Sequence, residues 1–378
     1  MVYLDYNATT PLDPAVRDEI VQALDAVGGN PSSVHAAGRR ARALIDDARD
    51  RLAAVLRARP HEIIFTAGGT ESCNLGVIGL ARAHAPQGRH LITSAIEHHA
   101  VLHACEHLAH FEGFELTVLP VDATGVVDPE RLAAAIRPDT TVVSIMHANN
   151  ETGTIQPLGE LAKTCRDRGV FFHTDAIQTF GKLPVPELDQ LSALSLTAHK
   201  FYGPVGAGAL WLGSGIALAK TSYGGAHENT RRPGTENVAA IVGLAAAAER
   251  AIATASTESR RLEPLRETLW TGISAAVPSA IRNGNPAQCL ANTLNVSFPG
   301  CDGEALLMGL DLEGLCVSSG SACMVGSVQP SHVLLAMGVP PAHARATIRF
   351  SLGQKTSPED IARAIEAVRK VVHLSAAK

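Results

Sequence analysis

The chain has 378 residues, of which 46% are hydrophobic and 18% charged, and these proportions exclude a disordered or fibrous protein. Its formal net charge is −5 and it has no long basic run, which argues against nucleic acid as the main partner. No positively charged segment precedes an apolar one at the N-terminus. The longest apolar run, 238–248, is far shorter than the ~20 residues of a membrane span. We therefore expect a soluble, cytoplasmic protein without a membrane partner.

Short apolar segments alternate with helical stretches between residues 62 and 213. They predict strands at 62–66, 90–94, 115–120, 141–146, 170–174, 193–197 and 208–212. Gaps of about 20 residues separate the first six, which is enough for a crossover helix, so these strands should be parallel. The gap before 208–212 is too short for a crossover and predicts one reversed strand. The expected fold class is α/β with a mostly parallel, seven-stranded sheet.

Other signals predict helices and a second unit. An N-cap residue followed by proline marks helix starts at Asp13-Pro14, Asp128-Pro129 and Ser357-Pro358. An Ala-rich helix is expected over 237–262, and strands at 293–297, 317–318 and 347–351 predict a smaller α+β unit. We expect a large domain of residues 12–258 and a small domain of residues 259–378, joined by residues 1–11.

The seven cysteines are scattered along the chain and include no C-x-x-C pair, so neither a disulfide framework nor a structural zinc site is expected. Cys323 lies among small residues and glycines in 317–331, a pattern that predicts a mobile loop. A thiol in such a loop is either incidental or reactive. Most of the other cysteines are expected to be small buried side chains.

Ligands of open α/β sheets bind beyond the carboxyl ends of the strands, and unusual residues follow three strands here. A glycine-rich turn at 66–74 opens a helix whose free N–H groups could hold a phosphate, although a bare tight turn is an equal alternative. Asp175 follows the fifth strand and needs a partner when buried: a nearby His or Arg, or the protonated ring nitrogen of a cofactor. Lys200 follows the sixth strand. A lone lysine is usually a surface charge, but desolvation frees its amine for Schiff-base chemistry.

These three features together are the contacts that pyridoxal phosphate needs. His98, at the end of the second strand, is well placed to stack on a planar ring. His99, His103 and His107 share one helical face, but their order is not H-E-x-x-H, so we interpret them as a polar face and expect no metal.

The residues resemble those of the pyridoxal phosphate-dependent cysteine desulfurases, of the group I type within the class-V aminotransferase-like family. The resemblance extends over nearly the whole chain, through 3–11, 29–33, 69–72, 97–98, 146–153, 173–178, 199–204, 232–235, 318–323 and 348–353. Its most specific parts are the Ser-Ser-Gly-Ser-Ala-Cys run ending at Cys323 and the strand-end pair His199-Lys200. It implies a fold-type I pyridoxal phosphate-dependent transferase that forms a homodimer.

The resemblance also implies roles for the matching residues. Lys200, His98 and Cys323 would be catalytic: Lys200 would bind the cofactor covalently, His98 would stack on its ring, and Cys323 would become a persulfide. Asp175 would pair with the ring nitrogen, and Arg349 would clamp the substrate carboxylate beside Asn150. The remaining cofactor contacts would come from Gly69, Thr70, Thr197 and His199 at the phosphate, Asn150 and Gln178 on the ring hydroxyl side, and Thr235 of the neighbouring subunit.

The implied reaction converts L-cysteine to L-alanine and passes the sulfur to an acceptor protein such as an iron–sulfur scaffold. A selenocysteine lyase of the same fold is the alternative, and an adaptor that docks sulfur carriers is the alternative from another class. The sequence departs from the family at Gly68-Gly69-Thr70, where Gly-Ala-Thr is common. It also departs after Cys323, where Met-Val-Gly-Ser is less polar than usual and leaves the acceptor open.

Overall fold

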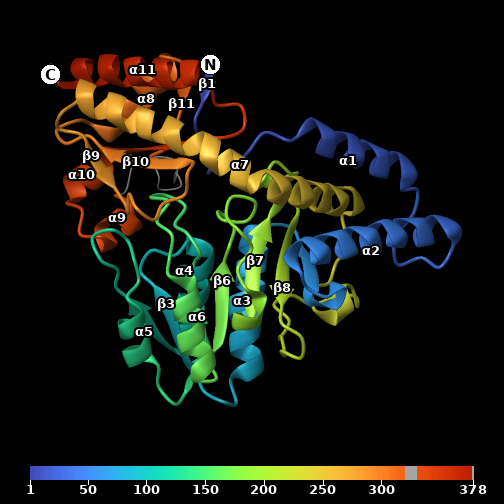
Figure 1. Cartoon of the computed structure of the whole chain (residues 1–378). Helices are drawn as coiled ribbons and strands as arrows, with labels where there is room; N and C mark the ends of the chain where they lie inside the picture. The colour runs from blue at the N-terminus through green and yellow to red at the C-terminus, as the bar shows by residue number, and fades with distance from the viewer. Residues whose placement is uncertain (320–329, 377–378) are drawn as a thin grey trace.

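The computed structural model describes residues 1–319 and 330–376, with side chains described as far as residue 373. A seven-stranded sheet forms the centre of the larger unit of the molecule, with helices around it (Figure 1). Its spatial order is β2-β8-β7-β6-β5-β3-β4. The strands are β2 (Ile63–Thr66), β3 (His90–Ser94), β4 (Glu115–Leu119), β5 (Thr140–Ser144), β6 (Phe171–Asp175), β7 (Ala193–Thr197) and β8 (Gly208–Leu212).

The predicted sheet is confirmed. Strands β3 to β7 pair in parallel, and β8 runs antiparallel to both β2 and β7. The bounds of β3, β7 and β8 are those predicted, and the others differ by one or two residues at either end. Every residue of β3, β5, β7 and β8 is buried because helices cover both faces of the sheet.

Helices on the two faces build separate apolar layers. On one face lie α3 (Gly69–His84) and α4 (His99–Phe111). On the other lie α1 (Pro14–Ala26), α2 (Ala36–Leu56), α5 (Pro129–Ala135), α6 (Leu158–Asp167) and the first part of α7 (Val238–Ala276). The predicted caps are confirmed: Asp13 and Asp128 each accept a backbone N–H at 2.8 Å at the start of α1 and α5. Short 3-10 turns occur at η1 (Pro60–Glu62), η2 (Leu188–Gln190), η3 (Ala198–Lys200) and η4 (Glu228–Thr230).

The Ala-rich helix α7 has 39 residues and extends diagonally from the sheet to the smaller unit (Figure 1). Its predicted end at residue 262 is wrong, because the helix continues through Pro264. The residues beyond the proline, including Leu269 and Ile273, pack into the second core and hold the helix. The helix is long and apolar enough to cross a membrane. However, 72% of its most apolar 18-residue stretch is buried inside the protein, as in a core helix. The expected boundary between residues 258 and 259 falls inside α7.

The smaller unit has its own apolar core, formed by residues such as Leu269, Val296 and Phe350 together with Val2 and Leu4 from the N-terminus. Its antiparallel sheet has the order β12-β10-β9. The strands are β9 (Ile281–Asn283), β10 (Thr293–Ser297) and β12 (Thr347–Ser351). Helices α8 (Gly303–Leu312), α9 (His332–Ala336), α10 (Pro341–Arg345) and α11 (Pro358–Ala376) complete the unit, α11 beginning at the predicted proline.

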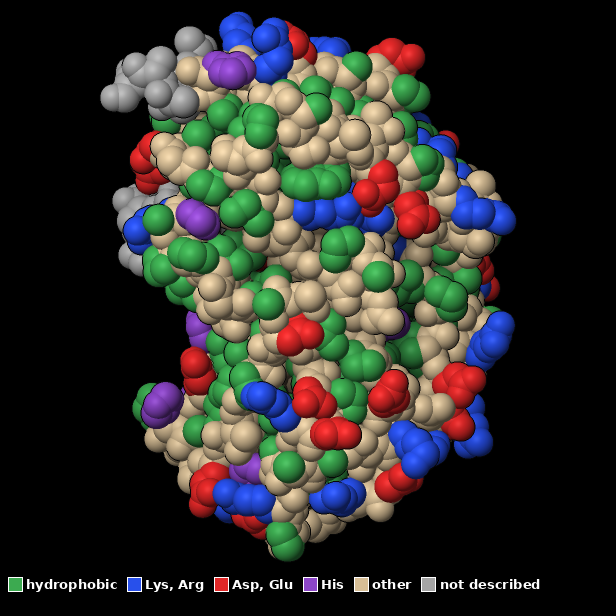
Figure 2. Space-filling model, turned by 60° about the vertical axis from the view of Figure 1, so that its left-hand side comes forward, with side chains coloured by type: hydrophobic (Ala, Val, Ile, Leu, Met, Phe, Trp, Pro, Cys, Tyr) green, Lys and Arg blue, Asp and Glu red, His purple; other side chains and the backbone are tan. Residues whose placement is uncertain are grey.

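The N-terminal strand β1 (Val2–Tyr3) pairs in parallel with β11 (Leu315–Cys316). The strand predicted at 317–318 is therefore wrong by two residues. Ser318 instead forms a single antiparallel bridge with Arg349 of β12. Figure 2 shows acidic and basic side chains interspersed on one face of the molecule.

Candidate active site

A pocket of about 440 Å³ lies beyond the carboxyl ends of the parallel strands, and residues of the smaller unit, Ser318, His332 and Arg349, line its other side. It collects ten of the predicted site residues: Gly69, Thr70, His98, Asn150, Asp175, Gln178, Thr197, His199, Lys200 and Arg349. Cys323 lies outside the described residues, and Thr235 lies elsewhere.

Lys200 ends the 3-10 turn η3 that follows β7 directly. Its Nζ donates to the backbone carbonyls of Asn7 at 2.6 Å and Ala8 at 2.7 Å. Burial lowers the pKa of Lys200 to about 8, and the positive charge of Arg349 adds to this effect. A substantial fraction of the amine is therefore neutral near pH 8, which suits it to act as a nucleophile or base.

Asp175 is the last residue of β6 and is 5% exposed. Its Oδ1 accepts the backbone N–H of Ile177 at 2.9 Å. Burial raises the pKa of Asp175, while the Ile177 N–H and the charges of His98 and Lys200 oppose that rise. Among the described residues, no Lys, Arg or His makes a salt bridge with Asp175. A cation placed beside it would relieve the cost of burying this carboxylate.

His98 is the N-cap of α4, and its Nδ1 accepts the backbone N–H of Ala100 at 3.1 Å. A neutral ring in this contact carries its proton on Nε2. Burial lowers the pKa of His98, which favours the neutral form. The neighbouring His99 stacks on His103, with ring centroids 4.6 Å apart, while His107 turns to Glu112 at 3.2 Å. The three histidines of this helix face therefore do not converge on one point.

The glycine-rich turn leads into α3, so Gly69 and Thr70 bring the N–H groups of a helix N-terminus to the pocket. A Cβ atom at Gly69 would meet the end of the Ile177 side chain, so the alanine that is common in the family at this position requires Ile177 to shift. His199 faces the same region and contacts Thr9 Oγ1 at 3.2 Å. Burial lowers the pKa of His199 to about 4, so it is neutral.

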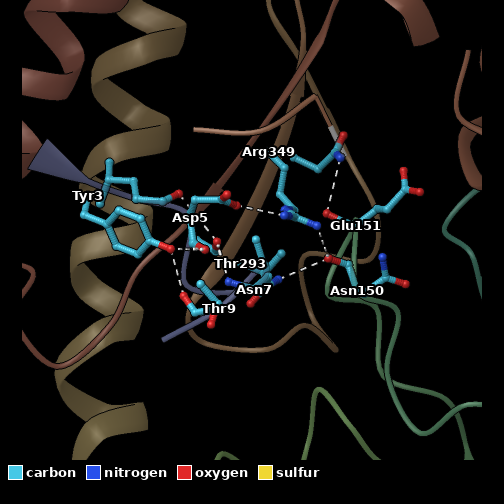
Figure 3. Close-up of polar contacts among 12 residues, drawn as sticks. Tyr3, Asp5, Asn7, Thr9, Asn150, Glu151, Thr293 and Arg349 are labelled. Carbon is cyan, nitrogen blue, oxygen red and sulfur yellow. Dashed lines mark hydrogen bonds and ion pairs between the residues drawn. The ribbon is translucent and has the colours of Figure 1, made fainter. Parts of the chain in front are cut away.

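Arg349, on β12, is 5% exposed and reaches the pocket from the smaller unit (Figure 3). Its Nη2 binds Asp5 Oδ1 at 2.9 Å, and its Nη1 donates to the Asn150 carbonyl at 3.1 Å. Its Nε is buried without a hydrogen-bond partner in the described part of the chain. The guanidinium thus has unused donor capacity for an anion.

The segment that contains Cys323 begins and ends beside this pocket. Ser318 pairs with Arg349, whose backbone N–H donates to the Ser318 carbonyl at 2.6 Å. On the other side, Ser331 Oγ donates to the buried Glu151 Oε2 at 2.5 Å, and His332 contacts the Glu97 carbonyl at 2.9 Å. Ser318 and His332 themselves line the pocket.

The family described as aminotransferase class-V matches residues 2–364. This chain belongs to the class-V aminotransferase family. The cysteine desulfurase IscS of Dictyoglomus turgidum is 46% identical over 373 residues, which cover 98% of this chain and 94% of that protein. Among solved structures, a NifS-like protein is 36% identical, with a TM-score of 0.92 and 99% of both chains covered. The protein SspA in complex with cysteine is also 36% identical, with a TM-score of 0.81 over 93% of this chain and 99% of that one.

The class-V aminotransferase pocket also contains residues to which the sequence analysis gave no role. Asp5, Asn7 and Ala8 line it from the N-terminal segment, although Asp5 and Asn7 belong to the motif 3–11 that carries the resemblance. Lys182 lies behind Gln178 and donates to its Oε1 at 3.0 Å. Burial lowers the pKa of Lys182 to about 7. The only sign of this contact in the sequence is that Lys182 follows Gln178 by four residues.

Thr235 does not join this chain's pocket. It lies beside a separate cavity of about 870 Å³ with Arg49, His227 and Glu228. Arg49 forms a bidentate pair with Glu228, which is 5% exposed, at 2.6 and 2.9 Å. Nearby, His227 Nδ1 and Glu236 Oε2 are buried without hydrogen-bond partners among the described residues, although Glu236 Oε2 lies 3.9 Å from His227 Nε2.

Proposed function

We propose that this protein is a pyridoxal phosphate-dependent cysteine desulfurase that converts L-cysteine to L-alanine and transfers the sulfur through Cys323. The observation that carries the proposal is the single pocket that combines the Lys200 amine, the Asp175 carboxylate and the Arg349 guanidinium. The names of the relatives, which include cysteine desulfurase IscS, support the same reaction.

The residues present fit pyridoxal phosphate. Asp175 is a buried carboxylate without an ion-pair partner among the described residues, and a protonated ring nitrogen supplies the missing cation. The N-terminus of α3 at Gly69 and Thr70 suits a phosphate, and His98 would lie against the ring. When bound, the cofactor supplies an electron sink for the carbon atoms of the substrate.

The chain's own residues then have distinct tasks. Arg349 binds the substrate carboxylate through its guanidinium, whose Nε has no hydrogen-bond partner among the described residues, and this fixes the substrate's orientation. The neutral fraction of Lys200 accepts the Cα proton of the substrate, as its lowered pKa allows. The Cys323 thiolate attacks the substrate sulfur, so the C–S bond breaks as an S–S bond forms. L-cysteine and the thiol thus give L-alanine and a persulfide without an external oxidant.

The position of Cys323 along the chain supports this role. Cys323 is five residues beyond Ser318, and five residues span at most about 18 Å. The described anchors on both sides, Ser318 and His332, line the pocket. The thiol is therefore tied to the site by a short stretch of chain.

The proposal includes a homodimer in which Thr235 completes the partner's phosphate site. His227 lines the cavity that contains Thr235, and its buried Nδ1, which has no hydrogen-bond partner among the described residues, supports an interface there. We further propose a cytoplasmic location and an acceptor protein such as an iron–sulfur scaffold. The six described cysteines, all free thiols, are consistent with a reducing compartment.

The test uses the full chain loaded with pyridoxal phosphate. L-cysteine should yield L-alanine, and mass spectrometry should find one extra sulfur on Cys323. Cys301→Ala is the matched control, because Cys301 is a half-buried thiol outside the pocket. Alanine formation without a persulfide would instead support the lyase, and comparison of L-cysteine with L-selenocysteine would separate the two.

A further inference from the structure

Asp5 holds the guanidinium of Arg349 (Figure 3). The ion pair joins Asp5 Oδ1 to Arg349 Nη2 at 2.9 Å, and the two side chains are 21% and 6% exposed. Both residues line the pocket. A carboxylate of the protein therefore occupies one of the N–H groups that a substrate carboxylate needs.

The remaining donors of Arg349 show what the pairing leaves available. Nη1 is shared with the Asn150 carbonyl at 3.1 Å, and the buried Nε has no partner in the described part of the chain. Arginine binds a carboxylate best through two parallel N–H groups. With Nη2 engaged by Asp5, an incoming carboxylate has to share or displace that contact.

The backbone fixes the position of Asp5 independently of Arg349. Asp5 forms a parallel bridge with Ser351, two residues after Arg349 on β12. Its carbonyl accepts the Tyr3 hydroxyl at 3.1 Å and the Ala8 N–H at 3.0 Å. These contacts hold the Asp5 backbone beside β12 without using the Arg349 side chain.

We propose that Asp5 is a resting-state counter-ion that competes with the substrate carboxylate for Arg349 and sets the affinity of this subsite for monocarboxylates. The inference rests on the proposed function, since it takes Arg349 as the carboxylate clamp. Asp5 weakens the binding of small anions and, by restoring the ion pair, assists release of the alanine product. The negative charge of Asp5 also raises the pKa of Lys200, whereas the positive charge of Arg349 lowers it.

The variant Asp5→Asn isolates the charge, because asparagine keeps an acceptor for Arg349 Nη2. The probe is propionate, a monocarboxylate without an amine, titrated into the cofactor-loaded protein and followed by the visible absorption of the cofactor. We expect the dissociation constant for propionate to fall about three- to tenfold, as removal of a nearby negative charge requires. Cysteamine is cysteine without its carboxylate. It should bind to Asp5→Asn no more tightly than to the wild type.

Two variants calibrate the measurement. Asp139→Asn removes the negative charge of one of the two partners of Arg137, at 2.8 Å and outside the pocket, and should leave propionate binding unchanged. Arg349→Gln should weaken propionate binding at least tenfold. Unchanged propionate binding in Arg349→Gln would overturn the inference, because the probe would then bind elsewhere.

Unchanged or weaker propionate binding in Asp5→Asn would likewise overturn the inference and make Asp5 an anchor for Arg349. The proposed function fails separately, when the wild type binds propionate at Arg349 but forms no alanine from L-cysteine. In that case the role of Asp5 stands.

Discussion

Asn7 connects the two units of the molecule through its side chain, and Asn7→Ala should destabilise the fold. The substitution removes four hydrogen bonds (Figure 3 shows Asn7 with Asn150 and Thr293). Nδ2 donates to the Asn150 carbonyl at 3.2 Å and to Thr293 Oγ1 at 2.9 Å. Oδ1 accepts from Asn292 Nδ2 at 2.9 Å and from Lys182 Nζ at 3.3 Å.

The magnitude follows from what each partner keeps. The Asn150 carbonyl retains Arg349 Nη1, and Lys182 Nζ retains Gln178 Oε1. Asn292 Nδ2 retains the Leu352 carbonyl, and Thr293 Oγ1 retains Asn292 Oδ1. No partner is left wholly unsatisfied, so each lost bond costs a net ~0.5–1.5 kcal/mol. We expect Asn7→Ala, which removes four such bonds, to lower the free energy of unfolding by about 2–6 kcal/mol.

The assay is urea-induced unfolding followed by far-ultraviolet circular dichroism. Gln190→Ala is the control, because it removes one exposed hydrogen bond, to Glu187 at 2.9 Å, and should change the free energy of unfolding by less than about 0.5 kcal/mol. The Asn7 carbonyl that accepts from Lys200 remains in the variant, so covalent attachment of the cofactor should persist. A loss below about 1 kcal/mol, or a variant indistinguishable from Gln190→Ala, would refute the reasoning.

The remaining predictions concern three other residues. Lys200→Ala should fold with a wild-type circular dichroism spectrum, yet borohydride should attach no cofactor to it and no alanine should form; wild-type turnover would contradict this. Cys323→Ala should bind the cofactor but lose persulfide and, by several orders of magnitude, alanine formation, since a positioned nucleophile supplies about 7 kcal/mol or more; near-normal alanine release from L-cysteine would indicate a lyase. Burial raises the pKa of Glu97 to about 8 from the usual 4.5, so the folded protein holds a proton that the unfolded chain loses between these pH values. Stability should therefore fall as pH rises from 4.5 to 8, by at most about 5 kcal/mol. Glu97→Gln should flatten that slope in urea unfolding series, and parallel pH curves for the two proteins would argue against a protonated Glu97.

The large sheet could be predicted because its strands are short apolar segments buried on both faces. For β3, β7 and β8 the local composition sets both ends, and the short gap before β8 sets its direction. Ala-rich composition predicted too early an end for α7, since the helix continues through Pro264, where packing of Leu269 and Ile273 outweighs the usual helix-breaking effect of proline. The short strands β1 and β11 pair across more than three hundred residues, which no local pattern indicates.

Some pocket residues could likewise be predicted from the sequence, and others could not. Asp175 and Lys200 were predictable because they follow strands, and the topology places strand ends at the ligand site. Asp5 was not, because its partner Arg349 is 344 residues away and only the folded chain shows the pair. The roles proposed for the individual residues stay predictions until the variants are measured.

The N-terminal segment contacts both Lys200 and Arg349, the two side chains on which the proposed chemistry depends. Lys200 follows the large sheet and donates to the carbonyls of Asn7 and Ala8, while Arg349 extends from the small sheet to Asp5. A displacement of this segment would therefore move the amine and the carboxylate clamp together. Arg349 also shares backbone hydrogen bonds with Ser318, from which the chain leads to Cys323. In the proposed mechanism, one strand, β12, thus carries the arginine that binds the substrate's carboxylate and pairs with the start of the segment that contains Cys323. The proposed mechanism therefore ties both the orientation of the substrate and the start of the Cys323 segment to the same strand, which suits an attack on a bound sulfur atom.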